Sequence, residues 1–288
     1  MYAITGITGQ VGGELAQVLL RAGRQVRAVV RDMKKGAGWK NRGCEIAVAD
    51  MADASALSAA FRGTEGIFVL LPPVFDPLPG FPEARATIAT LRSAIETARP
   101  AKVLCLSTIG AQAKRTNLLT QLGLTEQILG DLPMPITFLR AAWFMENCRW
   151  DVPSARDTGV IHSFLQPLDK PVPMVTTADI GRVAAEILQQ AWTGRRVAEL
   201  EGPTRVTPND VAAAFSKILG HPVRAEAVPR RSWTELFKSQ GMKNPMPRIE
   251  MLDGFNEGWI EFEHGQTGSQ KGTVGLETAL RAIIADVK

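Results

Sequence analysis

The chain has 288 residues, of which 45% are hydrophobic and 22% charged, proportions typical of a globular protein that can bury a sizeable core. The formal net charge is +4, but Lys and Arg are scattered apart from one cluster at 31–40, which disfavours nucleic-acid binding. No apolar stretch reaches the roughly 18 residues needed to span a bilayer, and no basic or apolar leader precedes the first strand. We therefore expect a cytoplasmic protein without a membrane segment.

The first element is a short apolar strand over 3–5, followed by an amphipathic helix over 11–22. Three glycines spaced three residues apart, Gly6, Gly9 and Gly12, join the two. Gly6 allows a tight turn, Gly9 lets a pyrophosphate approach the main chain, and Gly12 lets helix and strand pack closely. Because free N–H groups and a partial positive charge lie at a helix N-terminus, this pattern predicts a site for a phosphate-bearing dinucleotide.

Apolar strands alternate with helices up to about residue 140, which is typical of a doubly wound parallel sheet. After the first strand and helix, we expect strands at 25–31, 45–49, 66–71, 102–108 and 136–140, and helices at 54–61, 83–98 and 118–129. Beyond residue 140 we expect short strands, helices at 180–192 and 208–220, a stretch from 241 to 275 interrupted by Gly and Pro, and a last helix over 276–287. That last helix is expected to dock on the C-terminal lobe.

This pattern predicts a Rossmann-like α/β fold in which a doubly wound parallel sheet carries a smaller C-terminal α+β lobe. We expect a dinucleotide-binding domain at 1–150 and a substrate-binding lobe at 151–288 that is interleaved with the sheet.

Ligands of parallel sheets bind beyond the carboxyl ends of the strands, and the second strand ends at Arg31. Proteins that prefer a plain ribose usually place an acidic side chain here. A guanidinium instead pairs bidentately with a 2′-phosphate, and Lys34 and Lys35 add charge nearby, so the pattern favours NADP over NAD. The alternative is a solvated loop end.

The next two strand ends offer a carboxylate and an apolar wall. Asp50 can accept a hydrogen bond from the adenine amino group while Met51 covers the ring, although a helix cap is the alternative because Asp50 and Asp53 both precede a helix. Leu71 and Pro72, at the end of the fourth strand, form an apolar wall for the cofactor.

Further candidates follow the fourth, fifth and sixth strands. Phe75 and Phe81 lie in a Pro-rich loop that either walls the substrate pocket or simply turns the chain. Ser107 offers a hydroxyl at the mouth of the site, with a turn-forming role as the alternative. Trp143 and Phe144 can stack on a flat acceptor or pack between the lobes.

The acid and base of ordinary short-chain dehydrogenases, a Tyr and a Lys four residues later, have no counterpart here. The single tyrosine is Tyr2, inside the first strand, and Glu126 is the one ionisable side chain of the helix over 118–129. No catalytic residue is therefore assigned. The three cysteines and three histidines are widely separated, so we predict neither a disulfide nor a metal site.

The glycine turn, Arg31 and several later segments together resemble the NmrA-like family of atypical short-chain dehydrogenases, over nearly the whole chain. Those segments are Thr137-x-Leu139-Arg140, Phe144-Met145-Glu146-Asn147, Thr177-Ala178-Asp179-Ile180-Gly181, Gly202-Pro203 and Thr207-Pro208. Family members include NAD(P)H-dependent reductases of quinones, azo dyes, triphenylmethane dyes and imine or phenolic intermediates. Others are regulators that bind the dinucleotide without turning it over.

The resemblance implies a set of cofactor and substrate residues by position. Together with the strand-end candidates, the cofactor set is Gly6, Thr8, Gly9, Gln10, Val11 and Gly12 at the pyrophosphate, Arg31, Lys35, Asp50 and Met51 at the adenosine half, and Leu71, Pro72, Ser107, Arg140 and Trp143 at the nicotinamide half. The expected substrate pocket comprises Phe75, Trp143, Phe144 and Asn147.

The chain departs from the family pattern at Leu122, where many family enzymes carry Lys or His four residues before the glutamate that matches Glu126. Ala141 also replaces a common proline, which affects only local backbone shape. General acid catalysis contributes about 10²- to 10⁴-fold, so its loss disfavours reactions that must protonate an alkoxide. Planar electron-poor acceptors do not need it, because their reduced forms take protons from water.

These observations favour an NADPH-preferring reductase of a quinone, an azo compound or a related dye, with a small aromatic acceptor as its partner. Two alternatives remain open. One is a dinucleotide-binding sensor that reports to a protein partner, and the other is a reductase of a biosynthetic imine or phenolic intermediate.

Overall fold

β1 (Tyr2–Ile4) lies inside a parallel sheet, between β2 (Val26–Val30) and β4 (Gly66–Val69). The structure is a computed structural model that describes residues 1–287, and within that range the sheet has eight strands in the order β12-β10-β6-β5-β4-β1-β2-β3. Its other strands are β3 (Glu45–Val48), β5 (Val103–Thr108), β6 (Ile136–Ala141), β10 (Arg195–Glu201) and β12 (Gln270–Lys271). The chain reverses its direction of travel across the sheet between β1 and β4, so a ligand crevice is expected at this point.

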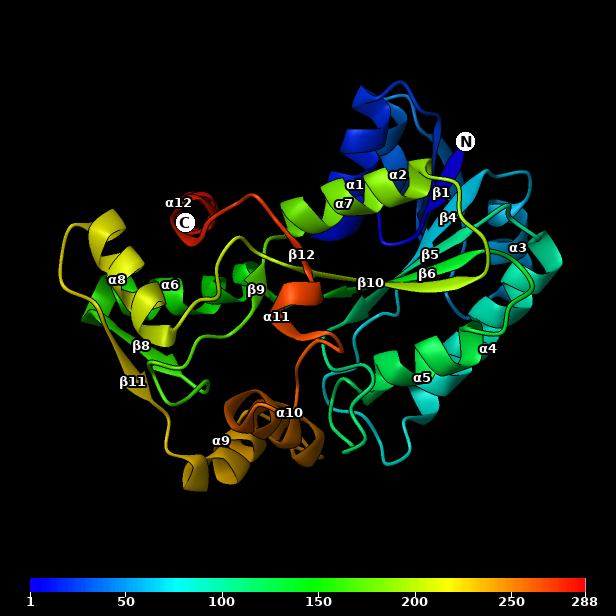
Figure 1. Cartoon of the computed structure of the whole chain (residues 1–288). Coiled ribbons are helices and arrows are strands. Elements are labelled where there is room, and N and C mark those ends of the chain that lie inside the picture. The colour runs from blue at the N-terminus through cyan, green and yellow to red at the C-terminus, as the bar shows by residue number, and fades with distance from the viewer. Residues whose placement is uncertain (288) are drawn as a thin grey trace.

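Helices cover both faces of the sheet (Figure 1), namely α1 (Gln10–Arg21), α2 (Met33–Lys40) and α7 (Thr177–Gln189) on one and α3 (Ala54–Phe61), α4 (Pro82–Ala98) and α5 (Thr120–Leu129) on the other. Strand side chains alternate between two cores. Tyr2 and Ile4 join the core under α1 and α7, whereas Ala3 between them joins the core under α3 and α4. The predicted Rossmann-like fold is confirmed.

The second half of the chain builds a smaller lobe beside the sheet (Figure 1). Its elements are β7 (Trp143–Phe144), η1 (Met145–Asp151), α6 (Val152–Thr158), β8 (Val160–Ser163), β9 (Met174–Val175), α8 (Pro208–Leu219), β11 (Arg224–Ala227), η2 (Arg230–Ser232), α9 (Trp233–Ser239), α10 (Met246–Glu257), α11 (Gly265–Gly268) and α12 (Leu276–Asp286). The two halves interleave, because β10 and β12 extend the central sheet. The division near residue 150 stays a prediction.

The expected docking of the last helix is confirmed. Lys217 of α8 pairs with Glu277 of α12 at 2.6 Å, and Arg156 of α6 donates to the Ile284 carbonyl at 2.9 Å. α12 therefore closes the smaller lobe against α8 and α6.

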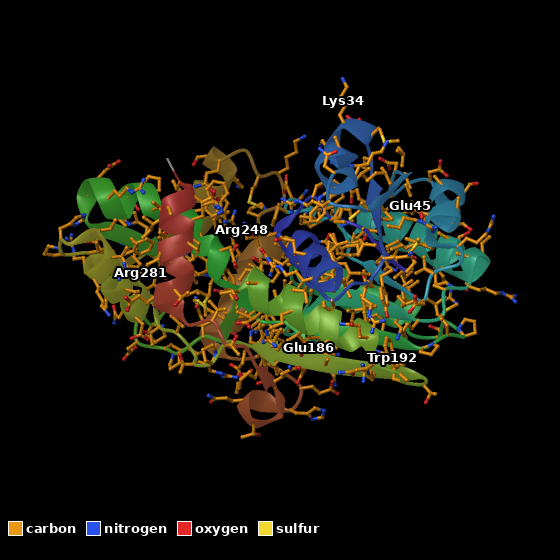
Figure 2. All side chains as sticks on the ribbon, turned by 90° about the horizontal axis from the view of Figure 1, so that it is seen from above. Lys34, Glu45, Glu186, Trp192, Arg248 and Arg281 are labelled. Atoms are coloured by element: carbon orange, nitrogen blue, oxygen red, sulfur yellow. The ribbon has the colours of Figure 1, made fainter. Side chains whose placement is uncertain are left out.

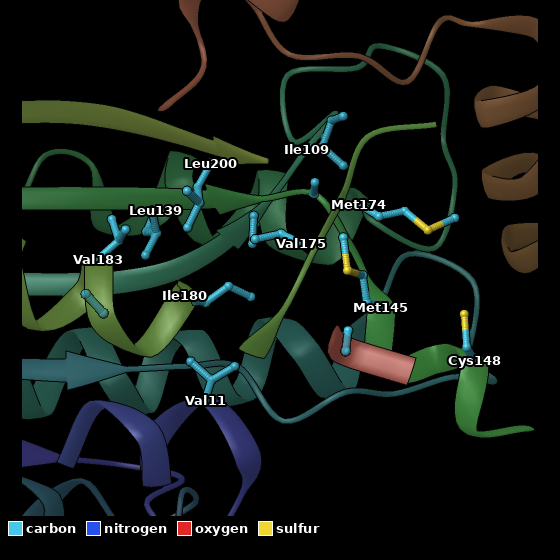
Figure 3. Packing of buried hydrophobic residues seen from close by; sticks show 14 of the residues in the cluster. Val11, Ile109, Leu139, Met145, Cys148, Met174, Val175, Ile180, Val183 and Leu200 are labelled. Carbon is cyan, nitrogen blue, oxygen red and sulfur yellow. The ribbon is translucent and has the colours of Figure 1, made fainter. Parts of the chain in front are cut away.

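A continuous apolar core joins the first helix to the lobe (Figure 3). Val11 of α1, Ile180 of α7, Leu139 of β6 and Met145 of η1 belong to one buried cluster. Packing this dense fixes the start of α1 relative to the segment that follows β6.

The six predicted strands and the predicted helices are present with shifts of a few residues at their ends. The pattern did not predict α2, α6, α9 or α10. Two glycines weaken the helical pattern of α2, but Asp32 caps it by accepting from the Lys34 N–H at 2.9 Å. α10 contains Gly254, yet it buries Ile249 and Phe255. Within residues 1–287 no helix is long and apolar enough to cross a membrane.

Candidate functional site

The glycine turn closes tightly between β1 and α1. Gly6 has φ of +63°, a conformation that favours glycine, and its carbonyl accepts a hydrogen bond from the Gly9 N–H at 2.9 Å. A Cβ on Gly12 would lie 2.4 Å from the Gly6 oxygen, so the helix can approach the turn only without that side chain. Both positions therefore require glycine for the turn to form.

The N-terminus of α1 is open to an anion. Its N-cap, Gly9, offers no side-chain acceptor, and no acidic residue lies in the first turn. Thr8, Gly9 and Gln10 are exposed, whereas Val11 and Gly12 are buried beneath them. The first amide groups of a helix lack partners within the helix, and the macrodipole favours negative charge there. The turn therefore fits a pyrophosphate held by backbone amides.

The residues expected at the adenosine half surround the ends of β2 and β3. Arg31 is exposed after β2 and forms no ion pair with any residue in 1–287. Lys34 points away from the molecule (Figure 2), and Lys35 is also exposed on α2. Among these cations, Arg31 lies closest in sequence to the strand end and is free to meet a phosphate.

At the end of β3, the structure shows the helix-cap alternative for one of the two acidic residues. Asp53 is the N-cap of α3, accepting from the Ala56 N–H at 2.9 Å. Asp50 is exposed and accepts from the Ala52 N–H at 2.9 Å through one oxygen, while Met51 is half-buried beside it. Adenine recognition by Asp50 and Met51 stays a prediction.

The predicted wall and pocket residues of the loop after β4 differ in their exposure to solvent. Leu71 is buried and Pro72 exposed, and Phe75 is 65% exposed at the loop's outer side. Phe81, the alternative pocket wall, is only 5% exposed and packs in the core under α3 and α4. This burial favours a packing role for Phe81 at the start of α4, and its part in a pocket wall stays a prediction.

The same loop is fastened to the second half of the chain. The Asp76 carboxylate accepts from the backbone N–H groups of Lys243 and Asn244 at 2.8 and 2.7 Å. These hydrogen bonds hold the pKa of Asp76 below its usual value. The loop after β4 and the segment before α10 thus lie side by side over the carboxyl end of the sheet.

The side chains of Ser107 and Arg140 both bind the carboxylate of Glu126. The Ser107 hydroxyl donates to Glu126 at 2.6 Å, and Arg140 binds the same carboxylate through Nε and a terminal nitrogen at 2.9 and 2.7 Å. Arg140 also pairs with Glu199 at 3.3 Å and Glu263 at 2.8 Å. These contacts place both polar groups in a buried ionic cluster, and their position beside the nicotinamide half stays a prediction.

The register of the sheet explains this cluster. Arg140 on β6 is the direct partner of Ser107 on β5 and of Glu199 on β10, so the three side chains form a row on the face that α5 covers. Glu126 reaches the row from α5. The pairing with β10 joins residues far apart in the sequence. Because the sequence pattern does not locate β10, it could not predict the partners of Arg140.

The aromatic residues after β6, Trp143 and Phe144, lie at the start of the smaller lobe, and Trp143 contacts α10. Trp143 packs edge-to-face against Phe255 of α10, with ring centroids 5.2 Å apart. Phe144 is half-buried beside it, and Asn147 is exposed on η1. For Trp143 the packing alternative therefore holds, and its stacking on an acceptor stays a prediction.

Two positions bear on the prediction that the site lacks the acid pair of the short-chain dehydrogenases. Tyr2 is 3% exposed inside β1, where burial is the main cause of its raised pKa. Leu122 is half-buried and packs in the core under α3 and α4. The three cysteines are free and buried, and burial raises the thiol pKa of Cys105 and Cys148. Residues 1–287 hold no cluster of three His, Cys, Asp or Glu able to bind a metal.

The fold and the open glycine turn at the β1/β4 crossover define a Rossmann-like protein of the dinucleotide-binding class. The model of the NmrA-like family matches residues 2–268, and the chain belongs to this family.

Several named proteins are similar to this chain over most of their length. The NAD(P)H azoreductase of Xenophilus azovorans is 28% identical over 259 residues, which are 89% of this chain and 85% of the relative. Quinone oxidoreductase 2 of Escherichia coli is 27% identical over 84% of this chain and 82% of its own.

Solved structures show the same fold. The E. coli NADPH-dependent quinone oxidoreductase complexed with NADPH has a TM-score of 0.82 at 24% identity, covering 98% of this chain and 99% of that one. The Citrobacter triphenylmethane reductase complexed with NADP(H) has a TM-score of 0.77 at 22% identity, with coverage of 98% and 99%.

Proposed function

We propose that this protein is an NADPH-dependent reductase that transfers a hydride to planar, electron-poor aromatic acceptors such as quinones or azo compounds. The observation that carries the proposal is the uncapped N-terminus of α1 inside the Gly6–Gly12 turn, with Arg31 exposed and unpaired nearby. The named relatives share the reductase class and a nicotinamide dinucleotide, whereas their acceptors differ.

The residues present suit NADPH. The amides at the start of α1 would bind the pyrophosphate, and the Arg31 guanidinium would pair with the 2′-phosphate of the adenosine ribose. When bound, NADPH supplies a hydride, and the acceptor gains this hydride and one proton in forming its reduced product.

The protein's part in the reaction is placement and exclusion of water. Trp143 and Phe144 offer part of their apolar surface at the carboxyl end of the sheet, and burial of a flat ring there would hold it in one orientation. Leu122 supplies no proton, so the product would take its proton from water, which suits acceptors whose reduced forms are stable as anions.

The direct test follows oxidation of NADPH by the purified protein with a panel of quinones and azo dyes. Acceptor-dependent oxidation is expected, and oxidation no faster than background across the panel would contradict the proposal.

Arg31→Ala tests cofactor choice, with Lys34→Ala as the matched control because Lys34 points into solvent (Figure 2). Loss of charge-assisted hydrogen bonds costs about 1.5–3 kcal/mol, so Arg31→Ala should weaken NADPH about 10- to 150-fold and leave NADH nearly unchanged. Equal losses for both cofactors would show that Arg31 does not bind the 2′-phosphate.

Leu122 and the buried Tyr2 favour one second candidate, a sensor that binds the dinucleotide without turnover. A ligand shifts a conformational equilibrium only through differential affinity. Calorimetry should then give different dissociation constants for NADP⁺ and NADPH, and equal values would remove the physical basis of a redox sensor.

A further inference from the structure

Arg248, on α10, is a partly buried cation without a carboxylate partner. Its guanidinium carbon lies 4.4 Å from the ring centroid of Phe237, and a terminal nitrogen lies 3.8 Å from the sulfur of Met242. Neither group neutralises the charge, and no residue in 1–287 forms an ion pair with Arg248. Burial lowers the pKa of Arg248, which reflects this missing anion.

The partly buried Arg205 and the exposed Arg230 of the same half pair with carboxylates, whereas the partly buried Arg196 donates to the neutral side chains of Thr137 and Gln190. Arg205 meets Glu261 at 2.7 Å and Glu201 at 3.0 Å, and Arg230, which also stacks on a Trp ring, binds Asp253 at 2.6 Å. Burying a cation without an anion is costly. Arg248 differs from these three arginines because its one side-chain hydrogen-bond acceptor is a sulfur atom, which leaves most of its donors unused.

The position of α10 brings Arg248 to the carboxyl end of the sheet. The Pro247 carbonyl accepts from the Leu118 N–H at 2.7 Å in the segment after β5, and Asp76 of the loop after β4 holds the amides of Lys243 and Asn244. The residues directly before Arg248 are thus fixed to the two loops that border the candidate site.

The helical period then sets the direction of the side chain. Phe255 follows Arg248 by seven residues, close to two turns of helix, so the two share one face of α10. Phe255 packs on Trp143, a predicted substrate-pocket residue. Figure 1 shows α10 beside α9 and far from α1 and α7.

We propose that Arg248 binds an anionic substituent, a sulfonate or carboxylate, on the aromatic acceptor. This assignment rests on the proposed reductase function and specifies its substrate class. The planar guanidinium presents a donor fork that matches both oxyanions, while the ring of Phe237 holds its other face.

The test compares 1,2-naphthoquinone-4-sulfonate with uncharged 1,2-naphthoquinone, using NADPH and three variants of the full-length protein. Arg248→Met keeps the apolar stem, Arg248→Lys keeps the charge, and Arg230→Met is the matched control because its arginine is stacked but paired. In Arg248→Met the KM for the sulfonate should rise about 10- to 100-fold, while the uncharged quinone changes less than about twofold. Arg248→Lys should recover part of the loss, and Arg230→Met should change neither KM.

Other outcomes overturn the assignment. An equal rise of both KM values would show a packing role, and an increased dissociation constant for NADPH would show that Arg248 serves a cofactor phosphate. Calorimetry with 2-naphthalenesulfonate, which the enzyme cannot reduce, measures the dissociation constant of an aromatic sulfonate without any turnover. If no acceptor is reduced, the proposed function fails, whereas loss of this binding in Arg248→Met still supports Arg248 as an anion site, and unchanged binding refutes it.

Discussion

Replacing Arg140 by Met separates a structural role from a cofactor role at a residue that the family resemblance placed beside the nicotinamide. The substitution leaves two carboxylates without their main cation: Glu126 and Glu199 have side chains that are 5% and 4% exposed. Breaking a buried pair from one side costs about 3–5 kcal/mol. Glu263, at 50% exposure, adds little because water screens it. We therefore expect the free energy of unfolding to fall by about 3–5 kcal/mol.

Urea unfolding followed by tryptophan fluorescence measures this loss, with Arg195→Met as the matched control. Arg195 lies 3.8 Å from the same Glu126 carboxylate but is 47% exposed, so its removal should cost less than about 1 kcal/mol. The double variant Arg140→Met/Glu126→Gln should be more stable than Arg140→Met, because one uncompensated charge is gone.

The affinity for NADPH, measured where each variant is folded, completes the test. If Arg140 holds the sheet to α5, the dissociation constant should change little in Arg140→Met. The reasoning is refuted if NADPH binding weakens about tenfold or more while the free energy of unfolding changes by less than about 1 kcal/mol.

Three further predictions follow from other parts of the structure. Gly12→Ala places a Cβ 2.4 Å from the Gly6 carbonyl oxygen, so NADPH binding by calorimetry should be lost or weakened at least about tenfold, and an unchanged affinity would exclude the turn as the pyrophosphate site. Burial raises the pKa of Asp151 from 3.8 to about 7, so the folded protein keeps a proton that the unfolded chain releases, and stability should fall as the pH rises from about 4 to about 7. In thermal unfolding Asp151→Asn should flatten this fall, and an unaltered pH profile would contradict it. Asp76→Ala should speed hydrogen exchange at the amides of Lys243 and Asn244, which an exchange rate equal to wild type would rule out.

The sequence was sufficient to predict the first half of the fold because its signals are local. Apolar strands, helical periodicity and the Gly6–Gly12 spacing are all contained within short windows. α2 was missed because its cap, Asp32, outweighs a weak helical composition, and α10 because glycine and prolines interrupt its pattern. The family resemblance supplied the cofactor class, but it did not indicate that Ser107 and Arg140 share a buried ionic cluster with Glu126.

The arginines show why part of the site could not be predicted from composition. Arg140 pairs with Glu126 of α5 and Glu199 of β10, and Arg205 pairs with the nearby Glu201 and with Glu261, which lies 56 residues further along the chain. Arg31 and Arg248 receive no such partner from residues 1–287. Whether an arginine meets a carboxylate depends on the register of the strands and on the path of β10 and α10. The residue type at a single position does not indicate it. An arginine is available to a phosphate or an acidic acceptor only where the fold brings no carboxylate to it. Arg31 at the adenosine end and Arg248 on α10 meet this condition, and both belong to the proposed site.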